Sequence, residues 1–222
     1  MSAAAASPVA PAEDRPAIPE NVVVYRDDGP LSRAIGRVLG ARVPVPAMTL
    51  LLAGIGVVLA LAAFVGRDAS KGLAAGAVAW LVLTMGITSA RWPKESFHWA
   101  VPPLVRLGEY STLAWLAATA GALPAAFALI AALTFRHYDL VYRLRHRAEI
   151  PPAWLNRLAA GWDGRVIIAW LLLALGALPA AMYIWAGLLG AVSVAESVVS
   201  WRRFERSRAT AGEFDELEGE GE

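Results

Sequence analysis

The chain has 222 residues, of which 57% are hydrophobic and 18% are charged. Soluble domains average roughly 45–50% apolar and about 25% charged residues, so this composition indicates an integral membrane protein. The lack of cysteine excludes a disulfide scaffold, a cysteine nucleophile and thiolate metal ligands. The net charge of +1 conceals a segregation, because arginines cluster beside apolar runs and six acidic residues lie within the last ten positions.

The segment before the first apolar run divides into two parts. Residues 1–21 are rich in Ala and Pro, which predicts a disordered leader and not a secretory signal. Residues 22–46 predict a cytoplasmic juxtamembrane segment. Within it Leu31, Ile35 and Val38 follow helical spacing while arginines point elsewhere, so we expect a short amphipathic helix on the membrane surface.

Residues 47–204 are predicted to form a membrane domain. Residues 47–66 and 72–90 are each long enough to cross a hydrocarbon core of about 30 Å, and a short turn joins them. Two helix-prone stretches of roughly forty residues follow, each about 60 Å long, which is twice one crossing. Each contains a Gly-Ala-Leu-Pro-Ala-Ala insert, beginning at Gly121 and at Gly176. Such an insert can end one helix and start another, or it can kink a single long helix.

The distribution of Lys and Arg decides between six short spans and four long, kinked spans. Six spans place 18 of the 20 basic residues on one side of the membrane, whereas four spans divide them 12 against 8. The positive-inside rule therefore favours an all-α, polytopic bundle of six transmembrane helices with both termini in the cytoplasm. Spans three-four and five-six form a parallel repeat, and an acidic disordered tail follows them. The remaining predicted ranges are approximately 104–122, 124–146, 163–178 and 179–203 for the spans, and 205–222 for the tail.

Charged side chains fall within the later spans at similar depths. Counted from the outer turns, ionisable groups on four helices lie about 18–25 Å inward, in one layer near the cytoplasmic side. Arg136, Asp139 and Arg143 follow i, i+3, i+7 spacing, so Asp139 can pair with either arginine. Because charges that face lipid are costly, we expect these groups to face one another, water or a ligand. The candidate polar cluster comprises Glu109, Arg136, His137, Asp139, Arg143, Asp163, Arg165 and Glu196.

The polar cluster has two interpretations. It can form a cytoplasm-facing pocket for a phosphate-bearing head group or a metal, or a structural network of paired charges whose arginines extend to the head groups. Glu109, Asp139 and Asp163 are candidate ligands for a divalent cation such as Mg²⁺, because hard cations prefer carboxylate oxygens. Asp163 equally suits a helix start, and a lone His137 near the interface favours a head-group contact over catalysis. Arginines along the membrane edges indicate anionic lipid as the partner and no nucleic acid.

The sequence holds no complete catalytic signature. Residues 28–33, Asp-Gly-Pro-Leu-Ser-Arg, resemble the start of the CDP-alcohol phosphotransferase signature. The later Gly and both later Asp residues of that signature are missing, and the segment precedes the first span. A Walker loop, a dinucleotide-binding glycine pattern, a nucleophile elbow and an HExxH motif are absent as well.

A longer pattern resembles an uncharacterised actinobacterial integral-membrane domain. Its most specific part is Phe-Arg-His-Tyr-Asp-Leu-Val-Tyr-Arg-Leu-Arg-His at 135–146, followed by Gly-Trp-Asp-Gly-Arg at 161–165. Residues 25–33 and 106–110 fit the same pattern, and the resemblance covers roughly residues 22–204. Members of that family often lie C-terminal to a CDP-alcohol phosphotransferase domain. The resemblance therefore implies a link to phospholipid head-group synthesis in a bacterial plasma membrane.

Together these observations lead us to expect an accessory or head-group-binding membrane module. Its expected partners are membrane lipids and a phosphotransferase or other lipid-synthesis enzyme, while its cofactors and catalytic residues are unknown. One alternative is a divergent metal-dependent phosphotransferase in which Glu109, Asp139 and Asp163 hold a divalent cation. A second alternative is a small transporter, which would require a continuous polar path although the outer halves of the spans carry no charge.

Overall fold

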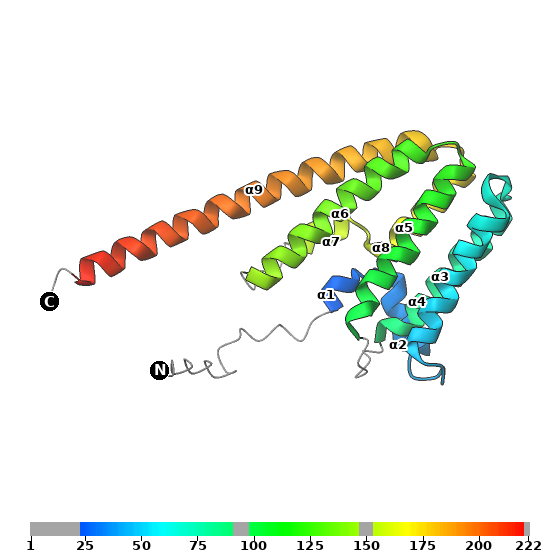
Figure 1. Cartoon of the computed structure of the whole chain (residues 1–222), viewed down its shortest axis with the longest axis horizontal. Helices are drawn as coiled ribbons and strands as arrows, with labels where there is room; N and C mark the ends of the chain where they lie inside the picture. The colour runs from blue at the N-terminus through cyan, green and yellow to red at the C-terminus, as the bar shows by residue number, and fades with distance from the viewer. Residues whose placement is uncertain (1–22, 91–97, 147–152, 220–222) are drawn as a thin grey trace, which may run out of the picture.

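A computed structural model describes residues 23–90, 98–146 and 153–219, so the predicted leader 1–21 lies outside the described residues. Within those ranges all regular structure is helical, as Figure 1 shows. Three short 3-10 helices, η2 (Gly66–Asp68), η3 (Thr88–Ala90) and η4 (His98–Ala100), connect or extend the longer helices. The α-helices are α1 (Val23–Arg26), α2 (Pro30–Leu39), α3 (Ala47–Phe64), α4 (Lys71–Ile87), α5 (Val101–Thr119), α6 (Leu123–His146), α7 (Ala153–Leu158), α8 (Gly161–Ala174) and α9 (Leu178–Gly219).

The helices α3 and α4 form a hairpin whose ends follow local chemistry. Pro46 directly precedes α3, where its missing N–H costs no helical hydrogen bond. After α3 the chain reverses through Gly66, whose φ of 57° lies in the left-handed region. Ser70 then caps α4, because its side-chain oxygen accepts a hydrogen bond from the Leu73 N–H at 3.1 Å.

The two Gly-Ala-Leu-Pro inserts close their helices in the same way. Gly121 and Gly176 have φ values of 65° and 74° and follow the ends of α5 and α8. The Ala122 N–H donates to Ala117 O at 2.8 Å, and the Ala177 N–H donates to Leu172 O at 2.9 Å. These are the 6→1 bonds of a Schellman motif, which satisfies carbonyls at a helix C-terminus. Both helices therefore end at the inserts, and separate helices begin after them.

All three of these turns lie at the same end of the molecule, and α2 lies at the other end (Figure 1). Hydrogen bonds join the turns to one another. The Trp115 indole N–H donates to Gly66 O at 3.0 Å, and the Lys71 ammonium donates to Ala174 O at 2.7 Å. The arrangement therefore gives the bundle one end made of tight turns and one end made of the N-terminal segment.

Two packing units make up the bundle. The first comprises α3, α4, α5 and α8, and the continuous apolar core extends from it into the second. The second is the pair α6 and α9, which run side by side (Figure 1). On α9 the buried face repeats at helical spacing and contains small residues, which allow close approach of helices in a membrane. Its buried residues on this face are Leu178, Met182, Ala186, Leu189, Ser193, Ser197 and Ser200.

The helix α2 packs through its small residues. Ser32 and Gly36 are buried, and a Cβ at Gly36 would lie only 2.1 Å from Ser89 Oγ, so a larger residue would separate α2 from α4. Leu31 and Val38 stay 44% and 55% exposed. The helix predicted within residues 22–46 thus exists, and part of its apolar side remains available to a membrane.

Three helical stretches are long and apolar enough to cross a membrane: Ala47–Phe64, Lys71–Ala90 and Leu178–Arg206. The helix α8 has 14 residues, or about 21 Å, which is short of a hydrocarbon core of about 30 Å. It is also shorter than the span predicted at 163–178, because its C-terminal closure begins before Gly176.

The helix α9 extends beyond the predicted last span. It has 42 residues and continues through Gly219, where the sequence predicts a disordered tail from residue 205. Its last turns contain Ala, Arg and Glu, which are strong helix formers, and lack proline. Local helix propensity therefore outweighs the negative charge of this region.

Candidate functional site

Residues 26–28 carry three charged side chains into the interior of the bundle. Arg26 and Asp28 pair at 2.9 Å, and each side chain is 1% exposed. The Arg26 guanidinium also donates to Thr88 Oγ1 at 3.0 Å and to Met85 O at 3.2 Å, at the C-terminal end of α4. A cation is favourable there because the last carbonyls of a helix lack intrahelical partners. Trp162 of α8 completes the pair, since its indole N–H donates to Asp28 Oδ1 at 2.7 Å.

Asp27 is the centre of a second group of charges. Its Oδ2 accepts hydrogen bonds from Arg165 Nη2 at 2.9 Å and Arg136 Nη1 at 3.0 Å. His137 Nε2 lies 3.3 Å from the same oxygen, and Arg106 Nη1 lies 4.0 Å from it. Burial by itself raises the pKa of Asp27, but Arg165, His137 and the other two arginines together hold that pKa well below its usual value. Asp27 is therefore a carboxylate in the folded protein.

Glu109 lies next to Asp27 and shares its partners. The Arg165 Nε and Arg106 Nη1 groups both donate to the Glu109 carboxylate, which is fully buried. Arg106 also donates to the backbone oxygen of Arg26, and Arg165 donates to Ala159 O. We call Asp27, Arg106, Glu109, Arg136, His137 and Arg165 the Asp27 network.

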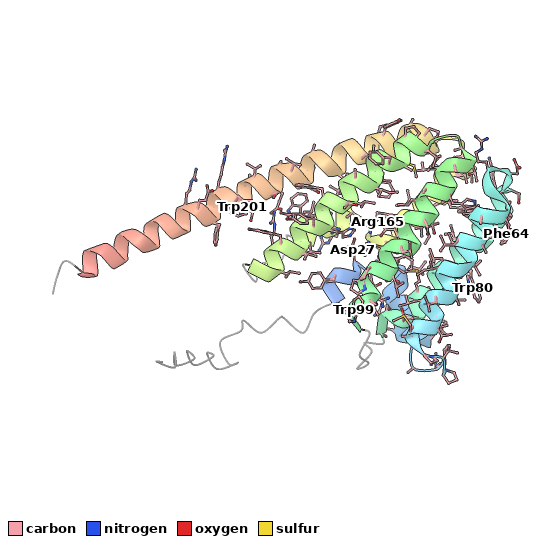
Figure 2. All side chains as sticks on the ribbon, viewed as in Figure 1. Asp27, Phe64, Trp80, Trp99, Arg165 and Trp201 are labelled. Atoms are coloured by element: carbon pink, nitrogen blue, oxygen red, sulfur yellow. The ribbon has the colours of Figure 1, made fainter. Side chains whose placement is uncertain are left out.

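The Asp27 network connects the two packing units of the bundle. Arg106 and Glu109 belong to α5, Arg165 belongs to α8, and Arg136 and His137 belong to α6. Figure 2 shows Asp27 and Arg165 close together between these helices. On α5, Tyr110 lies beside the network, and its hydroxyl is 2.9 Å from His137 Nδ1. One aspartate from the N-terminal segment thus holds α6 to α5 and α8.

A separate group of charges joins α6 to α9. Arg143 binds the Glu196 carboxylate through two parallel contacts, at 2.9 and 2.6 Å. Its Nε also lies 2.8 Å from Asp139 Oδ2, and the Ser197 hydroxyl donates to Asp139 Oδ1 at 2.8 Å. Of the two arginines that sequence spacing offers to Asp139, Arg143 is therefore in direct contact with it.

Asp163 belongs to neither group. It lies in the first turn of α8, as the sequence predicts, and its carboxylate caps another helix, α2. The backbone N–H groups of Gly29 and Ser32 donate to its two oxygens at 2.6 and 2.8 Å. The helices come close because Gly161 faces Gly29, where a Cβ on Gly161 would lie 2.5 Å from the Gly29 backbone.

The predicted metal ligands are thus distributed over three different arrangements. Glu109 is held by two arginines, Asp139 by Arg143 and Ser197, and Asp163 by two backbone N–H groups. Within the described ranges, no group of three or more His, Asp or Glu side chains is placed to hold a metal ion. The structure therefore does not assemble the cation site considered from the sequence.

Sequence reasoning missed the residues that link these groups. Arg26, Asp27, Asp28 and Arg106 are absent from the predicted cluster, although they form most of the contacts at its centre. Two sequence signals could have indicated them. Arg26-Asp-Asp-Gly is a compact charged motif before the first span, and Arg106 lies three residues before Glu109 on one helix face.

The helical bundle, its apolar spans and its buried ion pairs define the chain as an all-helical, membrane-associated protein. The chain belongs to a family of unknown function, DUF5941, whose model matches residues 19–218. No significant match was found among curated proteins or among solved structures.

Proposed function

We propose that the chain is a non-catalytic module with six membrane spans and both termini in the cytoplasm. It binds anionic phospholipid head groups at the cytoplasmic face and acts as an accessory to phospholipid synthesis. The observation that carries the non-catalytic part is that the candidate acids already have protein partners. A catalytic metal site would require Glu109, Asp139 or Asp163 to give up contacts that hold helices together.

Exposed cations at one end of the bundle support the lipid-binding part. Arg33, Arg37 and Arg42 are exposed on α2 and on the loop before α3. An arginine near an anionic membrane surface contributes about 1 kcal/mol of attraction. Trp99, which is 66% exposed, lies toward the same end in Figure 2, and tryptophan is enriched at membrane interfaces. Phe64 marks the opposite end, where the turns lie.

The arrangement of the turns supports the six-span topology. Three helical hairpins have their turns at one end, so α3, α5 and α8 run toward that end while α4, α6 and α9 return. The helices α5 and α6 carry more charge than an ordinary membrane span. Their charged groups are paired inside the bundle, so they need not face lipid. The link to phospholipid synthesis is supported by the resemblance to domains that accompany CDP-alcohol phosphotransferases.

Native mass spectrometry of bound lipids tests this proposal. The full chain in mixed micelles of phosphatidylglycerol and phosphatidylcholine is expected to retain phosphatidylglycerol preferentially. The triple variant Arg33→Gln, Arg37→Gln, Arg42→Gln should lose that preference by on the order of tenfold or more, because about 1 kcal/mol is lost for each charge.

Arg67→Gln is the matched control, because Arg67 is equally exposed but lies in the turn at the other end. It should retain the wild-type lipid preference. Equal retention of both lipids by the wild-type chain, or an equal loss in the triple variant and the control, would contradict lipid recognition at the α2 end.

A further inference from the structure

Donors converge on a single oxygen of Asp27. Arg165 and Arg136 contact Oδ2 at 2.9 and 3.0 Å, His137 lies at 3.3 Å, and Arg106 lies at 4.0 Å. Arg136 and His137 come from α6 and Arg165 comes from α8, while Arg106 of α5 donates to the neighbouring Glu109. A carboxylate oxygen has two lone pairs, and here more donors surround one oxygen than it can accept in good geometry.

The arginines of the Asp27 network are shared between two carboxylates. Arg165 and Arg106 contact both Asp27 and Glu109, while Arg136 contacts Asp27. Within the described residues, Arg106 Nε is buried and has no hydrogen-bond partner. A phosphate group carries more acceptor oxygens than a carboxylate, and clustered arginines bind it through charge-assisted hydrogen bonds. The donors around Asp27 therefore suit a phosphate better than they suit one carboxylate.

Asp27 reaches this position in an unusual way. Its φ is 52°, a left-handed conformation that is disfavoured for residues with a Cβ. It belongs to the N-terminal segment and not to any of the helices that supply its partners. The site is also partly open, because the side chains of Arg106 and His137 are each 14% exposed.

We propose that Arg106, Arg136, His137 and Arg165 form a phosphate-binding site that the Asp27 carboxylate occupies in this conformation. Phosphate and Asp27 compete for the same donors, and binding of a phosphate group displaces residues 26–32 from the bundle. When Asp27 leaves, three arginines face only Glu109, so the site gains affinity for an anion. This inference deepens the proposed function and rests on it for a lipid as the source of the phosphate.

The variant Asp27→Gly tests the competition directly. Glycine removes the carboxylate and readily adopts positive φ, so the variant disturbs the backbone less than other replacements do. With inorganic phosphate as the probe, isothermal titration of the full chain in neutral detergent should show saturable binding at least tenfold tighter in Asp27→Gly than in wild type. Asp68→Gly removes an exposed aspartate at the opposite end and should bind phosphate no better than wild type. A folded Asp27→Gly variant with wild-type phosphate binding would overturn the proposal.

Hydrogen exchange of the wild-type chain gives a second test that needs no substitution and that decides the matter if Asp27→Gly does not fold. In nanodiscs of phosphatidylglycerol, the amides of residues 26–32 should exchange at least tenfold faster than in phosphatidylcholine. Faster exchange only when inorganic phosphate is added to phosphatidylcholine nanodiscs would assign the site to a free anion. Unchanged exchange under both conditions would overturn the proposal.

The outcomes separate this inference from the proposed function. If residues 26–32 stay protected while phosphatidylglycerol retention still depends on Arg33, Arg37 and Arg42, the inference fails and surface lipid binding stands. If Asp27→Gly gains phosphate binding while lipid retention shows no preference, the site binds phosphate and the lipid function fails.

Discussion

Asp163 stabilises a helix that lies 131 positions earlier in the chain, because its carboxylate accepts the Gly29 and Ser32 N–H groups. These N–H groups belong to the N-cap residue and to the first turn of α2, where a helix has donors without intrahelical acceptors. Gly29 itself has no side chain to fill this role. One carboxylate of α8 therefore replaces a local cap and fixes α2 to the bundle.

We predict that Asp163→Ala weakens the attachment of α2. Loss of a helix cap typically costs about 0.5–2 kcal/mol, and here the two N–H groups would also remain buried. Hydrogen exchange of residues 30–36 should become faster by roughly tenfold, since 1.4 kcal/mol is a factor of ten. Asp68→Ala, at an exposed position, should leave that exchange unchanged. Identical exchange in the two variants would show that Asp163 does not cap α2.

The candidate site was only partly predictable from the sequence. Spacing along one helix offers both Arg136 and Arg143 to Asp139, and the structure shows the contact with Arg143. The partners of Asp27 lie 109 and 138 positions away, at Arg136 and Arg165, and no spacing rule relates such distant residues. The resemblance of residues 28–33 to part of a catalytic signature gives no indication that Asp28 pairs with Arg26.

The helices whose ends are marked by glycine and proline in the sequence were the most predictable elements. At Gly121 and Gly176 a glycine at positive φ ends one helix, and a proline in the first turn permits the next. Both signals lie within a few residues, so the sequence places the two candidate turns, although the same signals also allow a kinked helix and the charge distribution was needed to decide. The end of α9 has no such signal. Its extent depends on the balance between helix propensity and charge, which the sequence pattern alone did not resolve.

We predict that Gly121→Ala and Gly176→Ala each destabilise the bundle by about 1–2 kcal/mol, because alanine at positive φ brings its Cβ toward the carbonyl oxygen. Nothing lies within 4 Å of a Cβ built at either position, so the loss of stability would come from the backbone conformation and not from a steric clash. Gly187→Ala is the matched control in α9, with equally open space and a helical backbone. It should stabilise the chain by about 0.5–1 kcal/mol. These differences in unfolding free energy can be measured by circular dichroism in mixed micelles of increasing sodium dodecyl sulfate content. A change of the same sign in all three variants would contradict the role of Gly121 and Gly176 as positive-φ helix ends.

At the scale of the whole molecule, the two ends differ in charge and in construction. Arg67 and Lys71 are the basic residues at the three turns, whereas α2 and the following loop present Arg33, Arg37 and Arg42. The positive-inside rule therefore predicts that the α2 end faces the cytoplasm. The absence of cysteine from the sequence makes this topology directly accessible to single-cysteine labelling.

We predict that Asp68→Cys reacts with a membrane-impermeant maleimide in intact bacterial cells, because the proposed topology places the turns outside the cell. Ala41→Cys, which is also exposed, should react only after the membrane is permeabilised. The fraction of labelled protein on a gel-shift assay measures both. If Ala41→Cys is labelled in intact cells and Asp68→Cys is protected, the topology is the reverse of the proposed one. If both are labelled in intact cells, the two positions lie on the same side of the membrane and α3 does not cross it alone.

The contacts of Asp27 also have a consequence for biosynthesis. Arg165 leaves the ribosome 138 residues after Asp27, so this buried ion pair cannot form while the early helices are being inserted. At about 5–20 residues per second, the N-terminal segment waits on the order of ten seconds for its partner. During that interval the Asp27 carboxylate lacks its Arg165 partner. An early-translated residue therefore completes its set of contacts only after α8 has been made.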